Sequence, residues 1–385
     1  MRRLTLLLLG VVSVIGIGLV SPVMSDFALD FPEISQTDIS MVVTMPAITL
    51  LLGLLSCSIL SGRWQRKRIL LISLVLVTAG GIAPAFLNNF YLILICRGIL
   101  GFGMGFGMPL QASYFAEYPE QERAALFGWS SAMGGIISAV LLFLIALVRL
   151  PWRGAFLLYG FFALLFVMCI VFIPKEEKAV KQNIEHELER NAQAPALINK
   201  KELFALLLGY ITAFFVMAQY FIVPTTISFY LTQNGLGGAE EASVISSAGT
   251  LVMAGFGILY PYLYNRLRHR LPALVLLLGA AAFVLYAVPM NQMVLALGYC
   301  LIAVLATLFP MTVTMKITEI LPQNKVAVGS ASFTAIVFLG QFISPYYQKF
   351  IMEIMSCDTR GCYVVFAIIM LLLAILNAVS TKRSR

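Results

Sequence analysis

The sequence predicts an all-α membrane protein with 12 transmembrane helices in two pseudo-symmetric six-helix bundles. Three observations support this fold class. The chain of 385 residues is 60% hydrophobic and 11% charged, whereas about a quarter of the residues of a soluble domain are charged. Its apolar residues gather into about twelve runs, each long enough to cross a bilayer as a helix. A short basic turn also occurs twice, about 200 residues apart.

Each apolar run is expected to be one helix, because a helix satisfies its own backbone hydrogen bonds in lipid and the runs are too long for barrel strands. The first run starts after Met1-Arg2-Arg3 but has no convincing cleavage site, so we expect a retained membrane helix. The runs lie near 4–25, 39–60, 69–87, 90–115, 125–148, 153–173, 203–232, 242–264, 271–289, 292–316, 325–350 and 361–380.

One long polar stretch divides these runs into two sets of six. Pro174 ends the sixth run, and a mixed-charge segment follows it. We therefore predict an amino-terminal bundle over 1–174, a cytoplasmic linker over 175–201 and a carboxy-terminal bundle over 202–385. The linker is expected to be either a surface-lying helix or a loose connection.

The net charge of +8 would suggest a nucleic-acid partner in a soluble protein, but here the basic residues follow the membrane. If the amino terminus is cytoplasmic and the helices alternate, most of the 26 Lys and Arg residues face the cytoplasm. The exceptions are Arg149, Arg153, Lys349 and Arg360 outside, and Arg97 within a span. Cytoplasmic loops collect basic residues. We therefore expect a multi-pass protein of the cell membrane (inner or plasma) with both termini cytoplasmic, the bilayer as partner and no nucleic acid.

The repeated turn supports an internal duplication. Leu60–Arg68 joins the second and third runs, and Leu263–Arg270 joins the eighth and ninth. A second echo has the same offset, because Pro109 is followed by Glu117, and Pro310 by Glu319. Duplication of this kind is typical of transporters. The alternative is that two acidic and basic cytoplasmic loops resemble each other by chance.

The six-plus-six arrangement, central linker and basic turns resemble the major facilitator superfamily over the whole chain. The family's loop between its second and third helices reads G-x-L-a-D-R-x-G-R-[RK], and Ser58–Lys67 occupies that position. Gly62 replaces the acid and Gln65 the second glycine, while four other positions match. The resemblance implies gating through charge contacts between helix ends, built differently without the aspartate. A plain positive-inside anchor is the alternative for the last three basic residues. The gating candidates are Ser61, Gly62, Arg63, Arg66, Lys67, Arg68, Asn265, Arg266 and Arg270.

The fourth run resembles the family's R-x-x-x-G-x-G element. Arg97 begins it, and two small-xxx-small spacings follow, which favour close helix packing. A charge within hydrocarbon is costly unless it has a partner or faces a cavity. Arg97 is therefore either a contact for a substrate anion or a proton relay, or an arginine that backbone carbonyls hold in place to stabilise the fold. The packing glycines are Gly101, Gly103, Gly105 and Gly107.

Several other polar or aromatic residues within the runs are candidates for a central cavity. An amide in hydrocarbon needs a hydrogen-bond partner, so the glutamines are stronger candidates than the aromatics, which more often face lipid or neighbouring helices. Asp26, at the outer end of the first run, is the candidate for proton coupling, with a solvated loop acid as the alternative. The cavity candidates are Arg97, Gln111, Tyr114, Gln219, Tyr220 and Gln341.

The resemblance implies a secondary transporter that works by alternating access, and not an enzyme. We expect proton-coupled efflux of small amphipathic compounds by a monomer. The fifth run, however, lacks the proline of the family's drug:proton antiporter element. The alternatives are uptake of a small organic anion with Arg97 as its partner, or a sensor on a transporter scaffold. The sequence has no phosphate-binding loop and no metal-ligand spacing, so no cofactor or metal is expected. The spacing of Cys357 and Cys362 permits a disulfide but does not require one.

Overall fold

The computed structural model describes residues 1–61, 64–174, 200–288, 291–321 and 323–383, and all regular structure within these ranges is helical. In the first half the elements are α1 (Arg2–Leu8), α2 (Gly10–Gly18), η1 (Ser21–Val23), α3 (Met24–Asp30), α4 (Gln36–Ser61), α5 (Arg66–Ile82), η2 (Ala83–Phe86), α6 (Phe90–Phe115), α7 (Glu120–Val148), α8 (Trp152–Leu157), η3 (Leu158–Gly160) and α9 (Phe161–Phe172). In the second half they are α11 (Lys200–Gln233), α12 (Ala239–Leu267), η5 (Arg268–Arg270), α13 (Leu271–Ala287), α14 (Gln292–Ile320), α15 (Gln323–Met355) and α16 (Thr359–Arg383). The predicted linker falls almost entirely outside the described residues.

The described helices account for the 12 predicted spans. Ten are long and apolar enough to cross a membrane on their own. The segment from Arg2 to Asp30 qualifies as a pair bent by 42°. The shorter apolar helix Leu271–Ala287 corresponds to the remaining predicted run. The chain is thus an all-α membrane protein, as the sequence predicts.

The first predicted run is not one continuous helix, and this corrects the expectation for 4–25. It breaks between α1 and α2 and again at the short 3₁₀ turn η1. Pro22 lies in that turn and has no N–H to donate to the carbonyl of Gly18. The Ser21 hydroxyl donates to that carbonyl instead, at 2.9 Å. The α-helical hydrogen bonding therefore stops before the proline, and α2 ends at Gly18.

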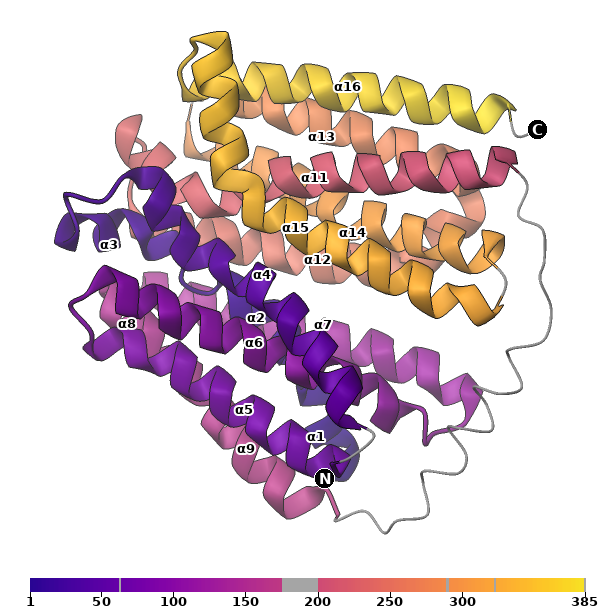
Figure 1. The fold of residues 1–385 in the computed structure, drawn as a ribbon. Coiled ribbons are helices and arrows are strands. Elements are labelled where there is room, and N and C mark those ends of the chain that lie inside the picture. The colour runs from indigo at the N-terminus through magenta and orange to yellow at the C-terminus, as the bar shows by residue number, and fades with distance from the viewer. Residues whose placement is uncertain (62–63, 175–199, 289–290, 322, 384–385) are drawn as a thin grey trace.

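The buried hydrophobic side chains form two clusters, one for each half of the chain. The first contains residues between Leu6 and Ile173, together with Phe229. The second contains residues between Leu206 and Ala374. Figure 1 shows the two groups of helices, from indigo to magenta and from red to yellow, meeting along one side of the molecule. We call the end with the termini and the ends of α9 and α11 the linker side, and the opposite end the loop side.

The glycines of α6 bring three helices close together. A Cβ at Gly101 or Gly105 would collide with the backbone of α4, at Pro46 and Leu50 respectively. A Cβ at Gly103 or Gly107 would instead collide with α5. Two interleaved pairs of glycines therefore serve two neighbouring helices, which is the packing that the spacing favours. They place α6 at the centre of the first half.

Two of the cysteines lie close to the turn between α15 and α16, one in the turn and one in the first turn of α16. Cys357 is partly buried and Cys362 is fully buried at the start of α16, and both are free thiols. The disulfide that their spacing permits is thus not formed in this structure.

Candidate transport pathway

The two halves are joined on the loop side. The 3₁₀ turn η1 and helix α3 pack against α11 and α12. The backbone N–H of Ser25 donates to Ser228 Oγ at 3.1 Å, and Gln233 Nε2 donates to Gln36 Oε1 at 3.3 Å. Each of these residues lies at or near the loop-side end of its helix. We call this set of contacts the loop-side seam.

Helices α7 and α12 extend the seam toward the middle of the molecule. Arg149 forms an ion pair with Glu240 at 3.0 Å at the loop-side ends. Two to three turns further in, the Ser247 hydroxyl donates to the carbonyl of Ala139 at 2.8 Å. At Gly135 the helices still touch, because a Cβ there would lie 2.8 Å from a side chain of α12. The close packing of this pair therefore reaches from the loop side to about the centre of both helices.

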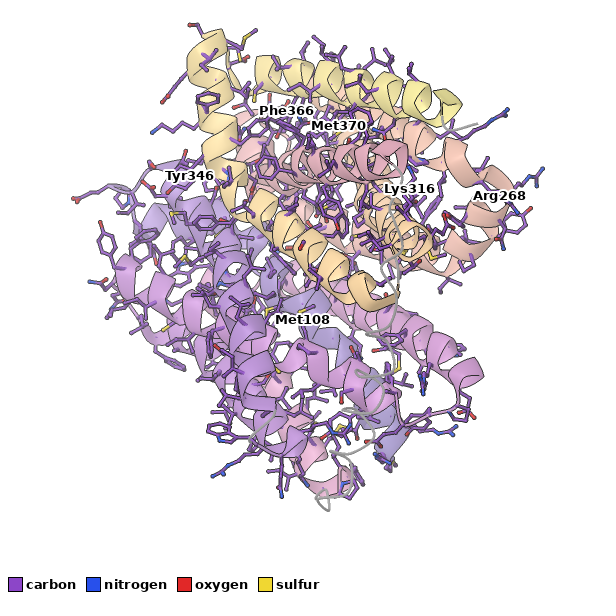
Figure 2. The ribbon with its side chains drawn as sticks, turned by 45° about the vertical axis from the view of Figure 1, so that its right-hand side comes forward. Met108, Arg268, Lys316, Tyr346, Phe366 and Met370 are labelled. Atoms are coloured by element: carbon purple, nitrogen blue, oxygen red, sulfur yellow. The ribbon has the colours of Figure 1, made fainter. Side chains whose placement is uncertain are left out.

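Helices α4 and α15 form the other part of the seam. Tyr346, labelled in Figure 2, lies where α15 meets the first half, and its hydroxyl donates to Met41 Sδ at 2.8 Å. These hydrogen bonds and this ion pair between the halves all lie in the loop-side part of their helices.

On the linker side, the basic turn of the first half binds to neighbouring helices of its own half. Arg66 Nη1 donates to the carbonyl and the hydroxyl of Ser113 at 3.1 and 3.0 Å. Its Nη2 forms an ion pair with Glu117 at 2.5 Å, and the guanidinium lies 4.8 Å from the ring centroid of Tyr114. Arg2 also pairs with Glu117. These contacts tie the linker-side ends of α1, α5 and α6 together.

Lys67 and Arg68 have local roles in the same turn. Lys67 Nζ donates to the carbonyls of Ile170, at 2.8 Å, and Ile173. These are unpaired carbonyls at the end of α9, where a cation is favoured. Arg68 lies over the ring of Trp64 at 5.5 Å. Both residues thus support helix ends within the first half.

The remaining gating candidates of this turn fall at the limit of the description. Gly62 and Arg63 lie outside the described residues, and Ser61 is placed only as the last residue of α4. The contacts of Arg66, Lys67 and Arg68 described above are with residues of the first half. A gating lock between the halves therefore stays a prediction.

The corresponding turn of the second half makes fewer of the described contacts with neighbouring helices. The Tyr264 hydroxyl donates to Glu319 at 2.7 Å, which joins α12 to α14. Arg266 donates to the hydroxyl of Tyr262, one turn earlier on its own helix, at 2.8 Å. Glu319 thus accepts from a tyrosine where Glu117 accepts from arginines. Two further candidates in this turn are exposed, namely Asn265 and Arg270.

Arg97 is fully buried at the centre of the first half. Its Nε donates to the carbonyl of Val42 at 2.6 Å, and its Nη1 donates to Tyr159 Oη at 2.9 Å. Its Nη2 donates to the carbonyls of Ile17 at 3.1 Å and Gly16 at 3.4 Å. All three guanidinium nitrogens are therefore used within the protein. This geometry matches the second sequence interpretation, an arginine held by backbone carbonyls, and it joins α6 to α2, α4 and η3.

Gln111 is also used structurally. Its Nε2 donates to Ser130 Oγ at 2.5 Å and to the carbonyl of Leu6 at 3.3 Å, which joins α6 to α7 and α1. Tyr114 is buried, with its ring beneath the Arg66 guanidinium near the linker-side end of α6. A contact of either side chain with a solute stays a prediction.

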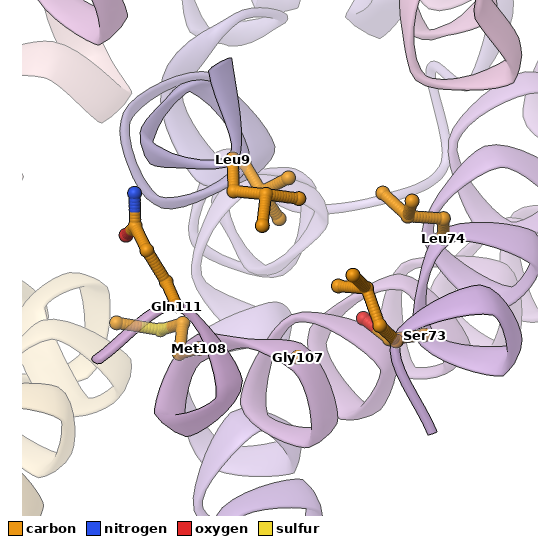
Figure 3. A pocket seen from close by; sticks show the side chains of 8 residues that line it. Leu9, Ser73, Leu74, Gly107, Met108 and Gln111 are labelled. Atoms are coloured by element: carbon orange, nitrogen blue, oxygen red, sulfur yellow. The ribbon is translucent and has the colours of Figure 1, made fainter. Parts of the chain in front are cut away.

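A small cavity lies beside Gln111 in the first half, as Figure 3 shows. Its volume is about 10 Å³, which is close to the minimum for one water molecule. It is too small for an organic solute. Its lining is mainly apolar and consists of Leu9, Val12, Leu70, Ser73, Leu74, Gly107, Met108 and Gln111.

Gln219 and Gln341, which we call the amide pair, lie on α11 and α15, two neighbouring helices of the second half. The two backbones approach closely there, because a Cβ at Gly340 would lie 2.8 Å from a carbonyl of α11. Both side chains are almost fully buried. Gln219 Nε2 donates to Tyr347 Oη at 3.2 Å. However, Gln219 Oε1 and Gln341 Nε2 have no hydrogen-bond partner among the described residues. One free acceptor and one free donor thus lie in the interior of the second half.

Tyr220 and Asp26 have partners outside this amide pair. The Tyr220 hydroxyl contacts Met253 Sδ at 3.7 Å, within the core of the second half. Asp26 is partly buried on α3, and its Oδ1 accepts from Ser25 Oγ at 3.4 Å. Asp26 is therefore next to a residue of the loop-side seam, since Ser25 also contacts Ser228.

The family model of the Major Facilitator Superfamily matches residues 6–345 of this chain. The chain belongs to the major facilitator superfamily. The chain is therefore a multi-pass membrane protein of a superfamily whose members are transporters.

Curated relatives of this superfamily member are distant. The sialic acid transporter NanX of Escherichia coli K12 is 22% identical over 51% of this chain and 48% of its own length. A probable sugar efflux transporter of Mannheimia succiniciproducens is 24% identical over 69% of this chain and 64% of its own length. The chain thus spans about half to two thirds of these relatives. Among solved structures, the nucleoside transporter NupG is similar with a TM-score of 0.75 and 13% identity, and the match covers 99% of each chain.

Two tyrosines that form hydrogen bonds between helices of this superfamily member were not among the residues predicted from the sequence. Tyr159 donates to the carbonyl of Gly16 at 3.0 Å and accepts from Arg97. Tyr347 accepts from Gln219. The available signal was the same in both cases, a tyrosine hydroxyl within an apolar run, which needs a partner when it is buried.

Proposed function

We propose that this chain is a secondary active transporter that moves a small organic solute by alternating access. The observation that carries the proposal is the one-sided seam. The halves are joined on the loop side, for example between Ser247 and Ala139. On the linker side, Arg66 binds Glu117 within the first half, and Tyr264 binds Glu319 within the second half. Two bundles that rock about a central site must separate on one side while they are joined on the other. The structure then represents the state that is closed on the loop side.

The solute is proposed to be a small amphipathic compound, and the direction is proposed to be efflux. A relative that is 24% identical over 69% of the chain is named a probable sugar efflux transporter, which supports this choice. Uptake of an organic anion with Arg97 as the charge partner has less support, because the guanidinium nitrogens are engaged by carbonyls and Tyr159. The amide pair Gln219 and Gln341 supplies a free acceptor and a free donor for a polar group of the solute.

Coupling to protons is proposed to involve Asp26. This carboxylate is partly buried beside the loop-side seam, where Ser25 bridges to Ser228. Opening the seam would expose the carboxylate to water, so its protonation state and the position of the halves are linked. In reconstituted vesicles, Asp26→Asn should abolish transport driven by a pH gradient while solute counterflow continues. Asp30→Asn, on the same short helix, is the matched control and should keep both activities. Gradient-driven transport at the wild-type rate in Asp26→Asn would exclude this coupling role.

Locking the seam tests alternating access itself. Ser247 and Ala139 face each other across α12 and α7 with a hydroxyl–carbonyl distance of 2.8 Å. In a background with the native cysteines replaced by serine, Ser247→Cys and Ala139→Cys should form a disulfide on oxidation. Oxidation should then stop counterflow, and reduction should restore it, whereas each single-cysteine protein should be unaffected. Undiminished counterflow with complete cross-linking would show that the seam does not open, and no counterflow in the reduced protein with any solute would favour a sensor.

A further inference from the structure

A polar pocket of about 350 Å³ lies on the loop side, away from the amide pair. Its walls come from the segment that begins α4, from α11 and from the ends of α15 and α16 that face one another. Its volume is in the range of small-ligand sites, about 300–1,000 Å³. Most of its lining residues carry hydroxyl, amide or charged groups, although the surface that they expose to the pocket is mainly apolar. The hydroxyl and amide residues are Ser35, Gln36, Thr37, Ser40, Thr226, Gln348 and Thr359.

Several hydroxyl oxygens of this pocket can accept hydrogen bonds from a ligand, because their hydrogens are already donated within the protein. Ser40 Oγ donates to the carbonyl of Gln36 at 2.9 Å, and Thr226 Oγ1 donates to the carbonyl of Ile222 at 2.7 Å. Tyr363 Oη lies 3.4 Å from the same threonine oxygen. Ser35 likewise donates to a neighbouring carboxylate at 2.7 Å. A hydroxyl has one donor and two acceptor sites, so these oxygens can still accept from a ligand that carries O–H groups.

The charged groups of the pocket favour a neutral ligand. Lys349 and Glu353 are one turn apart on α15, and their charged atoms are 4.0 Å apart. They are the lysine and the acid of the lining, and their charges balance. A charged ligand would compete with this pair and leave one member without its counterion. The Gln348 carboxamide makes no side-chain hydrogen bond in the described part of the chain, so it can both donate to and accept from a ligand hydroxyl.

We propose that this pocket binds a neutral polyhydroxyl solute, and that binding favours the state in which the halves are joined on the loop side. Ser40 belongs to the first half, and Thr226 and Gln348 belong to the second. The pocket therefore exists only while the loop-side seam is closed. A ligand that binds one state shifts the equilibrium toward that state. Binding itself does not depend on the proposed direction, solute or coupling of transport, whereas the effect on the seam rests on the proposed alternating access.

The test uses the purified full chain in lipid nanodiscs with D-sorbitol and D-glucose as probes and D-gluconate as the charged counterpart. We expect a saturable rise in melting temperature with at least one neutral probe and none with gluconate. Thr226→Val and Gln348→Leu should raise the half-saturating concentration about tenfold, because each removes a hydrogen-bonding group from the pocket. The matched control is Thr232→Val on the same helix, whose hydroxyl also donates one turn back, at 2.9 Å, but outside the pocket. The melting temperatures without ligand show whether each variant is folded.

The second arm measures the coupling to the seam. In the protein with Ser247→Cys and Ala139→Cys, the neutral probe should speed disulfide formation, and Gln348→Leu should remove this acceleration. Sugars and polyols stabilise proteins without binding, through exclusion from the surface. An unsaturable rise of equal size in all variants would therefore overturn the proposal. So would a saturable rise that neither variant weakens, an equal response to gluconate, or a cross-linking rate that the bound probe leaves unchanged.

Discussion

The two halves repeat each other in sequence but satisfy their buried polar groups differently. In the first half, the nitrogens of Arg97 donate to three backbone carbonyls and to Tyr159. In the second half, Gln219 and Gln341 are as deeply buried, yet one oxygen and one nitrogen have no partner among the described residues. An unsatisfied buried polar atom costs about 1–3 kcal/mol. The central charge of the first half is thus fully hydrogen-bonded, whereas the second half keeps buried amide atoms that a solute or a conformational change can satisfy.

The linker-side turns show the same difference. Arg66 makes two hydrogen bonds to Ser113 and an ion pair with Glu117, and its side chain is 11% exposed. In the second half, the corresponding acid Glu319 accepts from Tyr264, and both side chains lie in a more open setting. The duplicated turn has therefore kept its position in both halves, but only the copy in the first half anchors several helix ends.

The largest expected effect comes from removing the Arg97 guanidinium. Arg97→Met keeps the length and apolar volume of the side chain but leaves three carbonyls and Tyr159 without their donor. We expect a loss of about 3 kcal/mol in the free energy of unfolding, as for the loss of a partner in a buried charged network. Thermal unfolding in nanodiscs measures it.

Arg97→Lys sharpens this prediction. A lysine keeps the charge but has no planar fork for several carbonyls, so its stability should lie between those of wild type and Arg97→Met. If Arg97→Met were as stable as wild type, the hydrogen bonds of Arg97 would not stabilise the first half, and the contrast between the halves would be wrong. An undiminished melting temperature combined with loss of anion uptake would restore Arg97 as a substrate contact.

A smaller effect is expected for the linker-side turn of the first half. Arg66→Ala removes the hydrogen bonds to Ser113 and the ion pair with Glu117, and should lower stability by about 1–2 kcal/mol because charge-assisted bonds are partly screened here. Tyr264→Phe, the counterpart in the second half, removes one hydrogen bond and should cost about 0.5–1 kcal/mol. Parallel melting curves give both values. Equal losses would show that the two turns anchor their halves equally.

Most of the fold could be predicted from the sequence because composition and run length determine it. A chain that is 60% hydrophobic with long apolar runs has helices as its plausible state in lipid. The break in the first run was not predicted, although Pro22 signalled it, because the apolar run alone shows no interruption. The roles of the α6 glycines followed from their spacing. Which neighbouring helix each pair contacts required the three-dimensional arrangement.

The candidate site was less predictable because hydrogen-bond partners come from distant segments. The sequence left Arg97 open between a functional and a structural role, and only the carbonyls of α2 and α4 favour the second. Gln111 and Gln219 were predicted to need partners, but the same residue type ended in opposite situations. The side-chain nitrogen of Gln111 donates hydrogen bonds to Ser130 and Leu6, whereas the side-chain oxygen of Gln219 has no hydrogen-bond partner among the described residues. Local patterns cannot distinguish these outcomes.

The smallest expected effect on stability is at Gln341, and it tests the comparison most directly. Gln341→Leu removes a buried Nε2 that has no partner among the described residues, so the free energy of unfolding should stay unchanged or rise by up to about 1 kcal/mol. The same substitution in the first half, Gln111→Leu, removes bonds to Ser130 and Leu6 and should be destabilising. Counterflow should fall in Gln341→Leu, because the solute loses a hydrogen-bonding group. Equal destabilisation by both variants would mean that the Gln341 amide is satisfied in the folded protein, and the second half would then be as saturated as the first.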